Sequence, residues 1–251
     1  MKLRLLLGLA VVACAGLAAT QAGADPNAVP ICSSAGTALS GNYNQLVITG
    51  NAYVAGGTSL NVSGNLILAP GACLDAFTLG TVTVWGNIFV GQGATLGLGC
   101  TPESLGDPTL APCFDKTTND VVGGSIFANA PLTMYLDGNT IHGSVISLGG
   151  GPGVNGDFLN FPIKDNVIGG SLLVSGWQGG WFGVIRNHIG GTALINGNMS
   201  VQDSDSNEIQ TNTIRGSLIC FRNSPSTQVN PDDGGQPNVV GGLKIGQCAG
   251  L

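Results

Sequence analysis

A five-residue pattern, Asn-x-(Ile/Val)-x-Gly, recurs six times and constrains the fold more than any other feature of the sequence. Its copies start at Asn119, Asn139, Asn166, Asn187, Asn212 and Asn238, so successive starts lie 20, 27, 21, 25 and 26 residues apart. Recurrence at this length, with loops of different sizes between copies, is typical of a solenoid of stacked coils. The Ile or Val of each copy should point into the coil, and the Gly lets the backbone turn because it tolerates positive φ.

A second repeat, (Ile/Val)-x-Gly-Asn-x-x-(Val/Leu)-x-x-Gly-(Thr/Ala)-x-Leu, precedes these copies. It runs from Ile48 to Leu60, from Val62 to Leu74 and from Val84 to Leu96. Apolar residues alternate with polar or small ones, which is the period of a β-strand, and each Gly-Asn is typical of a turn. No stretch has the apolar spacing of an amphipathic helix, so the sequence predicts an all-β chain.

The segment Asn207-Glu208-Ile209-Gln210-Thr211-Asn212-Thr213-Ile214 contains paired Asn-x-Ile steps. It resembles the repeats of the pectate-lyase-like and carbohydrate-binding right-handed β-helix proteins, closely over residues 119–246 and loosely over 44–98. The resemblance implies a single-stranded right-handed parallel β-helix in which the recurring Asn side chains stack into a hydrogen-bonded ladder. We therefore expect a leader and cap at 25–43 and a β-helix domain at 44–251, with a loop leaving the stack at 101–118.

A leucine-rich-repeat solenoid is the alternative fold. The segment from Met134 to Gly143 fits its consensus, as do Phe161 to Gly170 and Phe182 to Gly191. A leucine-rich repeat also needs a spaced apolar set for its convex side, whereas short β-like runs and glycine-rich loops follow each of these segments. The sequence therefore favours the β-helix.

The N-terminus has the order of a secretory signal peptide. Lys2 and Arg4 precede an uncharged run from Leu5 to Ala19, and small residues follow, so we expect residues 1–24 to be removed and the protein to be secreted. Val11-Val12-Ala13-Cys14 also resembles a bacterial lipobox, which would make Cys14 a lipid anchor. The apolar run is too short to be favoured as a membrane span.

The chain is acidic. Its 8 basic and 14 acidic residues give a net charge of −6, and loss of Lys2 and Arg4 leaves 6 basic residues and a charge of −8. An acidic surface argues against nucleic acid and against anionic membranes as partners.

Six cysteines follow the predicted signal peptide. An even number without a Cys-x-x-Cys motif favours disulfides over metal binding in an exported chain. Six cysteines allow 15 pairings; we expect the local ones, which are Cys32–Cys73, Cys100–Cys113 and Cys220–Cys248.

Candidate binding residues are few, and no catalytic constellation is evident. The aromatic cluster Trp177, Trp181 and Phe182 would either stack on a sugar or fill the coil interior. Asp203, Asp205 and Asn207 resemble the opening of a calcium loop, since alternate oxygen ligands wrap a hard cation, and equally suit a polar loop between coils. A catalytic site would need carboxylates on one face, and its candidates are Asp137, Asp157, Asp165, Asp203 and Asp205.

These observations favour a secreted, non-enzymatic, adhesin-like or surface-associated protein that binds a polysaccharide or another cell-surface macromolecule. The alternatives are a polysaccharide lyase or glycoside hydrolase of the pectate-lyase-like fold, and a purely structural extracellular rod. No cofactor other than calcium is suggested by the sequence.

Overall fold

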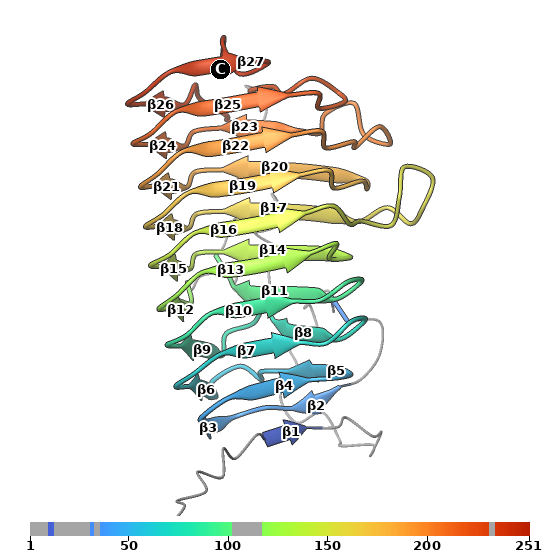
Figure 1. The fold of residues 1–251 in the computed structure, drawn as a ribbon, viewed down its shortest axis with the longest axis vertical. Coiled ribbons are helices and arrows are strands. Elements are labelled where there is room, and N and C mark those ends of the chain that lie inside the picture. Colours follow the sequence, from blue (N-terminus) through green and yellow to red (C-terminus); the bar gives the residue numbers. More distant parts are fainter. Residues whose placement is uncertain (1–9, 13–30, 33–35, 102–116, 231–233) are drawn as a thin grey trace, which may run out of the picture.

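The protein is a parallel β-solenoid of about nine turns, and the described residues contain no helix (Figure 1). The structure is a computed structural model that describes residues 10–12, 31–32, 36–101, 117–230 and 234–251. The predicted stack of β coils is confirmed, and the leucine-rich-repeat alternative is dropped because the described coils stack through three parallel sheets and contain no helix. Among these residues no helix occurs that is long and apolar enough to cross a membrane.

The coils contribute strands to three parallel sheets, here named sheets A, B and C. Sheet A contains β1 (Ala10–Val12), β4 (Leu46–Ile48), β7 (Leu66–Leu68), β10 (Ile88–Val90), β13 (Ile126–Asn129), β16 (Val145–Leu148), β19 (Leu172–Ser175), β22 (Ala193–Asn196), β25 (Leu218–Phe221) and β27 (Lys244–Gly246). Sheet B contains β2 (Thr37–Ala38), β5 (Asn51–Tyr53), β8 (Cys73–Ala76), β11 (Thr95–Gly99), β14 (Thr133–Asp137), β17 (Asn160–Lys164), β20 (Trp181–Ile185) and β23 (Glu208–Gln210). Sheet C contains β3 (Gly41–Tyr43), β6 (Ser59–Val62), β9 (Thr81–Val84), β12 (Val121–Val122), β15 (Thr140–Ile141), β18 (Val167–Ile168), β21 (His188–Ile189), β24 (Thr213–Ile214) and β26 (Val239–Val240).

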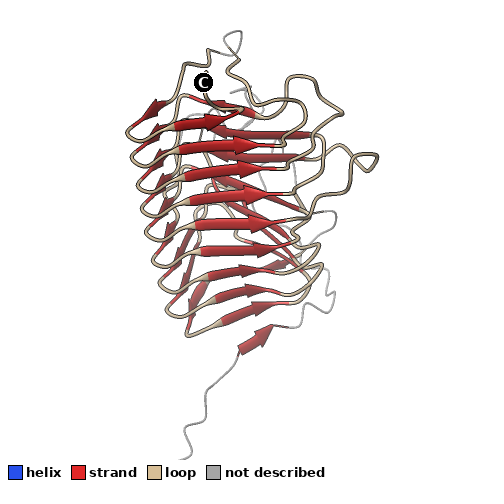
Figure 2. Ribbon diagram, turned by 45° about the horizontal axis from the view of Figure 1, so that its top comes forward, coloured by secondary structure: helices blue, strands red, loops and turns tan. Residues whose placement is uncertain are grey.

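The chain passes through sheets B, C and A in that order in each coil. Sheet A faces the viewer in Figure 1, sheet B lies behind it, and the short strands of sheet C form the left edge. Figure 2 shows the strands of successive coils stacked as parallel rungs. Residues one coil apart pair in register, so that Ile141, Ile168, Ile189 and Ile214 form one column of buried side chains. The prediction that the Ile of each copy points inward is confirmed for this column.

The expected asparagine ladder is present at the turn from sheet B to sheet C. It contains Asn139, Asn166, Asn187, Asn212 and Asn238, all of them buried. In each step the side-chain oxygen of one Asn accepts the backbone N–H of the preceding Asn at 2.9–3.1 Å and its Nδ2 at 2.8–3.0 Å. Each Nδ2 also donates to a main-chain carbonyl oxygen at 2.7–3.1 Å. The ladder therefore satisfies the polar groups of a buried turn.

The copy predicted to start at Asn119 is shifted by one residue. Strand β12 pairs with β15 so that Val121 lies beside Thr140, which places Asp120 beside Asn139 at the ladder position. Asn119 is exposed instead, and its side-chain oxygen accepts a hydrogen bond from the Thr140 hydroxyl. The motif fits either alignment, because Val121 and Val122 are both apolar and Gly123 and Gly124 are both glycine.

Two further polar ladders fix the other turns. Between sheets C and A, a side-chain oxygen of each coil accepts the backbone N–H of the next coil at 2.8–3.3 Å, and these side chains belong to Asn65, Asn87, Ser125, Ser144, Ser171, Thr192 and Ser217. After sheet A, the Trp177 N–H donates to Asn198, the Asn198 N–H to Asn223 and the Asn223 N–H to Gln247. In the coils from Trp177 onward, side chains as well as strand pairing thus hold all three corners of the solenoid.

Two of the predicted disulfides are present. Cys32 pairs with Cys73 at a Cα–Cα distance of 5.8 Å, and Cys220 pairs with Cys248 at 5.2 Å. They lie toward opposite ends of the stack, where the terminal coils lack a neighbour on one side. Cys113 lies outside the described residues, so the predicted Cys100–Cys113 pairing stays a prediction.

The N-terminal predictions are only partly visible. Most of the predicted signal peptide, including Cys14, lies outside the described residues, whereas Ala10–Val12 form β1 and pair with β4 at the end of sheet A. Strands β2 and β3 fall inside the segment predicted to be a leader and cap. Residues 102–116 of the predicted loop excursion are also outside the described residues, and a bridge between Cys100 and Thr118 joins its two sides.

Candidate functional site

The predicted aromatic contact is largely a core cluster. Trp177 and Phe182 are 0% exposed, and both pack against the buried Phe161 at ring-centroid distances of 5.3 and 5.7 Å. The Trp177 indole N–H donates to the Leu132 carbonyl oxygen at 3.1 Å. Trp181 alone is partly exposed, and its ring lies over Gly183 on the outer face of sheet B. Trp177 and Phe182 therefore fill the coil, and a sugar cannot stack on them at the surface.

We expect Trp177→Leu to reduce the free energy of unfolding by about 2–3 kcal/mol, because the smaller side chain leaves a cavity and an unpaired carbonyl. The matched control is Trp85→Leu, directly after β9 of sheet C, where the indole is 62% exposed. For this variant we expect the free energy of unfolding to change by less than about 0.5 kcal/mol. Guanidinium unfolding of both variants measures the difference. Equal effects of the two substitutions would contradict the buried role of Trp177.

The residues predicted to bind calcium lie in the loop before β23. An Asp203 carboxylate oxygen accepts the Asp205 backbone N–H at 2.9 Å, and the Asp205 carboxylate accepts a hydrogen bond from Asn230 Nδ2 at 2.7 Å. Asn207 is buried with φ of 56°, and its Nδ2 donates to the Pro225 carbonyl oxygen at 2.7 Å. These contacts account for the loop's shape, and calcium binding stays a prediction. Among the described residues, no group of three or more His, Cys, Asp or Glu side chains could hold a metal ion.

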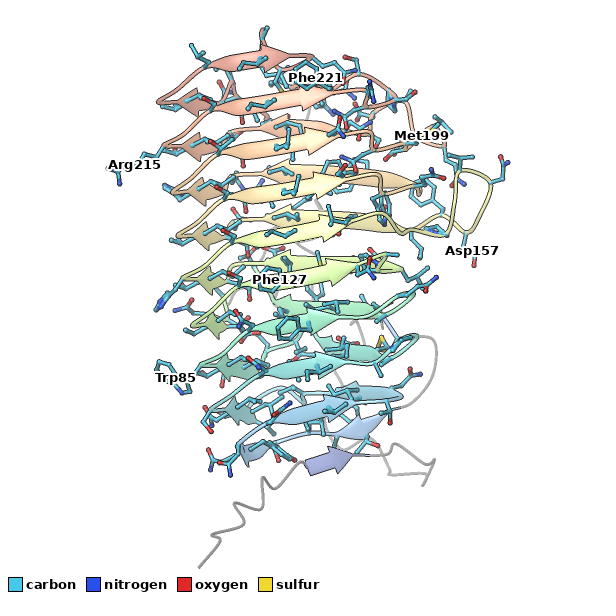
Figure 3. All side chains as sticks on the ribbon, viewed as in Figure 1. Trp85, Phe127, Asp157, Met199, Arg215 and Phe221 are labelled. Atoms are coloured by element: carbon cyan, nitrogen blue, oxygen red, sulfur yellow. A yellow bond between two sulfur atoms is a disulfide. The ribbon has the colours of Figure 1, made fainter. Side chains whose placement is uncertain are left out.

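Two of the five candidate carboxylates converge on the outer face of sheet B. The Thr101 hydroxyl lies 3.0 Å from an Asp137 carboxylate oxygen and 3.4 Å from an Asp165 carboxylate oxygen. Asp165 also accepts hydrogen bonds from Arg186 Nε and Nη2, both at 2.7 Å. Asp165 and Arg186 follow β17 and β20 with the same φ of 57°, so the fold itself places this ion pair in neighbouring coils. Asp157 lies in an outlying loop (Figure 3).

A buried lysine adjoins these carboxylates. Lys164 lies beside Asp137 in the register of β17 and β14, and it is 7% exposed. Its Nζ lies 4.9 Å from the centroid of the Trp181 ring. Burial lowers the pKa of Lys164, and the Asp137 carboxylate opposes that shift. Glu208 on β23 is also buried, at 2% exposure. The outer face of sheet B therefore carries several charged side chains that are largely buried. The spacing of Asp137 and Asp165 in the sequence did not predict that the two carboxylates would converge.

The outer face of sheet A is apolar, in contrast to the charged outer face of sheet B. The second residue of each sheet A strand from β4 to β27 is apolar and points outward, and register places all nine of these residues in one column, here called the apolar stripe. Its members are Val47, Ile67, Phe89, Phe127, Ile146, Leu173, Leu194, Ile219 and Ile245. None of them is buried, and Phe89 and Phe127 are 37% and 38% exposed. At about 4.8 Å per strand the stripe is roughly 40 Å long.

The columns beside the stripe are uncharged. On one side lie the Asn, Ser and Thr side chains of the ladder between sheets C and A. On the other side lie Asn129, Leu148, Ser175, Asn196 and Phe221. Leu148 and Phe221 are exposed, and Figure 3 shows Phe127 and Phe221 on the face of sheet A turned toward the viewer. Contiguous apolar surface of this extent is uncommon on a soluble monomer and commonly marks an interaction site.

A sequence signal for this stripe exists. Strands of sheet A read Leu-Val-Ile, Leu-Ile-Leu or Ile-Phe-Val, with no polar residue at the position that alternation turns outward. Strands such as β9, Thr-Val-Thr-Val, keep the usual alternation of outward polar and inward apolar residues. Strands apolar on both faces are expected where both faces are covered.

No known protein family, curated protein or solved structure matches this chain.

Proposed function

We propose that the chain is a secreted, non-enzymatic, surface-associated protein that binds a macromolecular partner through the apolar stripe of sheet A. The observation that carries the proposal is the stripe itself, nine apolar side chains in register with uncharged columns on both sides. The disulfides Cys32–Cys73 and Cys220–Cys248 support an oxidising compartment, where such bonds persist.

The chemistry of the stripe favours a protein surface over a polysaccharide. Seven of its nine members are aliphatic, and such side chains offer no hydrogen bonds to sugar hydroxyls. The Phe89 and Phe127 rings stack on each other at 5.6 Å and 15°, so they cover each other's faces instead of offering both as a platform for sugar rings. A flat apolar face of another protein fits this surface.

A polysaccharide lyase or glycoside hydrolase of the pectate-lyase-like fold is the second candidate. The convergence of Asp137 and Asp165 on Thr101, beside a lysine whose pKa is lowered by burial, favours it because acid–base chemistry needs such groups together. Against it, the Arg186 guanidinium holds Asp165 in two hydrogen bonds, and Asp137 is buried.

Two assays on the purified full chain distinguish the binding function from the enzymatic one. Retention on phenyl-agarose, at a concentration where the chain is monomeric, should fall for Phe127→Asp and remain for Val167→Asp, a sheet C control that is 51% exposed. Incubation with acidic and neutral polysaccharides, with and without calcium, should release no chain ends. Chain ends that appear with wild type and disappear with Asp165→Asn would replace the binding proposal by the enzymatic one.

A further inference from the structure

The charge distribution leaves sheet A as the face on which two copies of this acidic chain can meet. The net charge is −6, and Asp137, Lys164, Asp165, Arg186 and Glu208 gather on sheet B, which lies behind sheet A across the core (Figure 1). If two sheets A packed face to face, the two sheets B would lie about three sheet spacings, or roughly 30 Å, apart. That separation exceeds the Debye length of about 8 Å at physiological ionic strength, so repulsion between the charged faces is screened.

The stripe is also self-complementary when two copies run in opposite directions. Ile146 is the middle of its nine members, so a two-fold axis through Ile146 places each residue against the one equally far on the other side. Phe127 then meets Leu173, and Phe89 meets Leu194. In the parallel arrangement each Phe would instead meet itself, and its bulk would hold the flanking aliphatic residues apart. A closed two-fold contact also leaves no free stripe for further growth.

The area of sheet A is sufficient for such a contact. Its strands extend over roughly 40 Å, and three to four outward and flanking residues span about 10–13 Å across the sheet. Each copy thus contributes about 400–500 Å², and the pair buries about 800–1,000 Å², a size found in weak or transient complexes. An interface of this size predicts an association that depends on protein concentration.

We propose that two copies of this chain associate face to face through the apolar stripe, in opposite directions, with Ile146 at the two-fold axis. This inference rests on the proposed function, since it names the partner of the same surface. The second copy presents the same uncharged apolar stripe, so it offers the kind of surface that this face requires.

Light scattering on the full chain over a concentration series tests the association. The wild-type mass should rise from one chain toward two, and Phe127→Asp should need at least a tenfold higher concentration for the same rise, because it puts a charge into the apolar contact. Val167→Asp, the matched substitution on sheet C, should behave like wild type. Unchanged circular dichroism and thermal midpoint show that the variants are folded. A wild-type mass of one chain at every concentration overturns the proposal.

Cysteine cross-linking tests the direction. With a short thiol-reactive cross-linker, Ile146→Cys should give a covalent dimer, because the two-fold axis brings this position against itself across one sheet spacing of about 10 Å, which such a linker spans. Val47→Cys should not, because it meets Ile245 of the second copy. Efficient cross-linking of Val47→Cys without Ile146→Cys would overturn the antiparallel arrangement.

The outcomes also separate this inference from the proposed function. A monomer whose phenyl-agarose retention still depends on Phe127 rejects the second copy as partner and keeps sheet A as the binding face. A monomer whose retention is the same for wild type and Phe127→Asp rejects both.

Discussion

Replacing Asp120 by asparagine should remove most of the fall in stability that wild type shows as pH rises from about 4 to about 7. Asp120 stands at the ladder position beside Asn139 and is 0% exposed. Burial raises its pKa from 3.8 to about 7, although the backbone N–H groups of Val82 and Gly99 oppose the shift. The folded protein therefore binds a proton at Asp120 over a pH range in which the unfolded chain has already released it.

The geometry of the ladder assigns a partner to that proton. The Val82 N–H donates to Asp120 Oδ1 at 2.7 Å, just as the Asn139 N–H donates to Asn166 Oδ1 in a later step. Asp120 Oδ2 then corresponds to the Nδ2 that, in every other step, donates to the next Asn. Asn139 Oδ1, the acceptor of this step, is buried and accepts no hydrogen bond from the described residues. We therefore expect a protonated Oδ2 to donate to Asn139 Oδ1 while it still accepts the Gly99 N–H at 2.9 Å.

The direction and the size of the expected pH effect follow from the linkage between proton binding and folding. Between pH 3.8 and about 7 the folded state holds more protons than the unfolded state, so the free energy of unfolding falls as pH rises. A difference of about three pKa units corresponds to on the order of 4 kcal/mol. Asp120→Asn cannot titrate, so its stability should change much less across this window. At low pH the variant should be less stable than wild type by about 1–3 kcal/mol, because Nδ2 cannot accept the Gly99 N–H.

Guanidinium unfolding at several pH values measures this difference directly. Asp75 contributes in the same direction, since burial raises its pKa to about 6, so the comparison is between wild type and variant at each pH. Asp75→Asn, made in the wild-type and in the Asp120→Asn backgrounds, separates the contributions of these two carboxyl groups to the pH dependence of stability. Infrared spectra near neutral pH should show a protonated carboxyl band in wild type and its loss in Asp120→Asn. Parallel pH profiles for wild type and Asp120→Asn would contradict a proton at this position.

Asn187→Ala should destabilise the protein by about 3–5 kcal/mol, because it breaks the ladder at its centre. The Asn187 side-chain oxygen accepts the N–H and Nδ2 of Asn166, and its Nδ2 donates to Ile163, Ile185 and Asn212. All of these groups lose a buried partner that water cannot replace, since the site is fully enclosed. The loss exceeds that of one ordinary hydrogen bond, because several polar groups are left unpaired at once.

The matched control is Asn196→Ala, on the exposed side of sheet A. Asn196 is only partly buried, and its Nδ2 donates to the Ser175 hydroxyl at 3.2 Å. We expect a loss below about 1 kcal/mol in denaturant unfolding. If Asn187→Ala costs no more than Asn196→Ala, the ladder contributes little to stability, and strand pairing alone holds the coils.

The sequence by itself determined the architecture of the coil. The Asn-x-(Ile/Val)-x-Gly copies predicted an inward Ile and a stacked Asn at each turn, and Asn139, Ile141, Asn187 and Ile189 occupy these positions. The disulfides Cys32–Cys73 and Cys220–Cys248 were also predicted correctly. Such features follow from the direction of each side chain within its own strand or turn, which local spacing fixes.

Only the tertiary structure decided which residues of different coils adjoin. The register of β12 with β15 gave the ladder position to Asp120 instead of Asn119, and the loop after Gly176 turned Trp177 into the core. Asp137 and Asp165 meet at Thr101, although the coil loops separate them by many residues. The apolar stripe likewise exists only once nine strands are in register. Loop lengths between coils set that register, and a single strand carries no information about the neighbour on which it will stack.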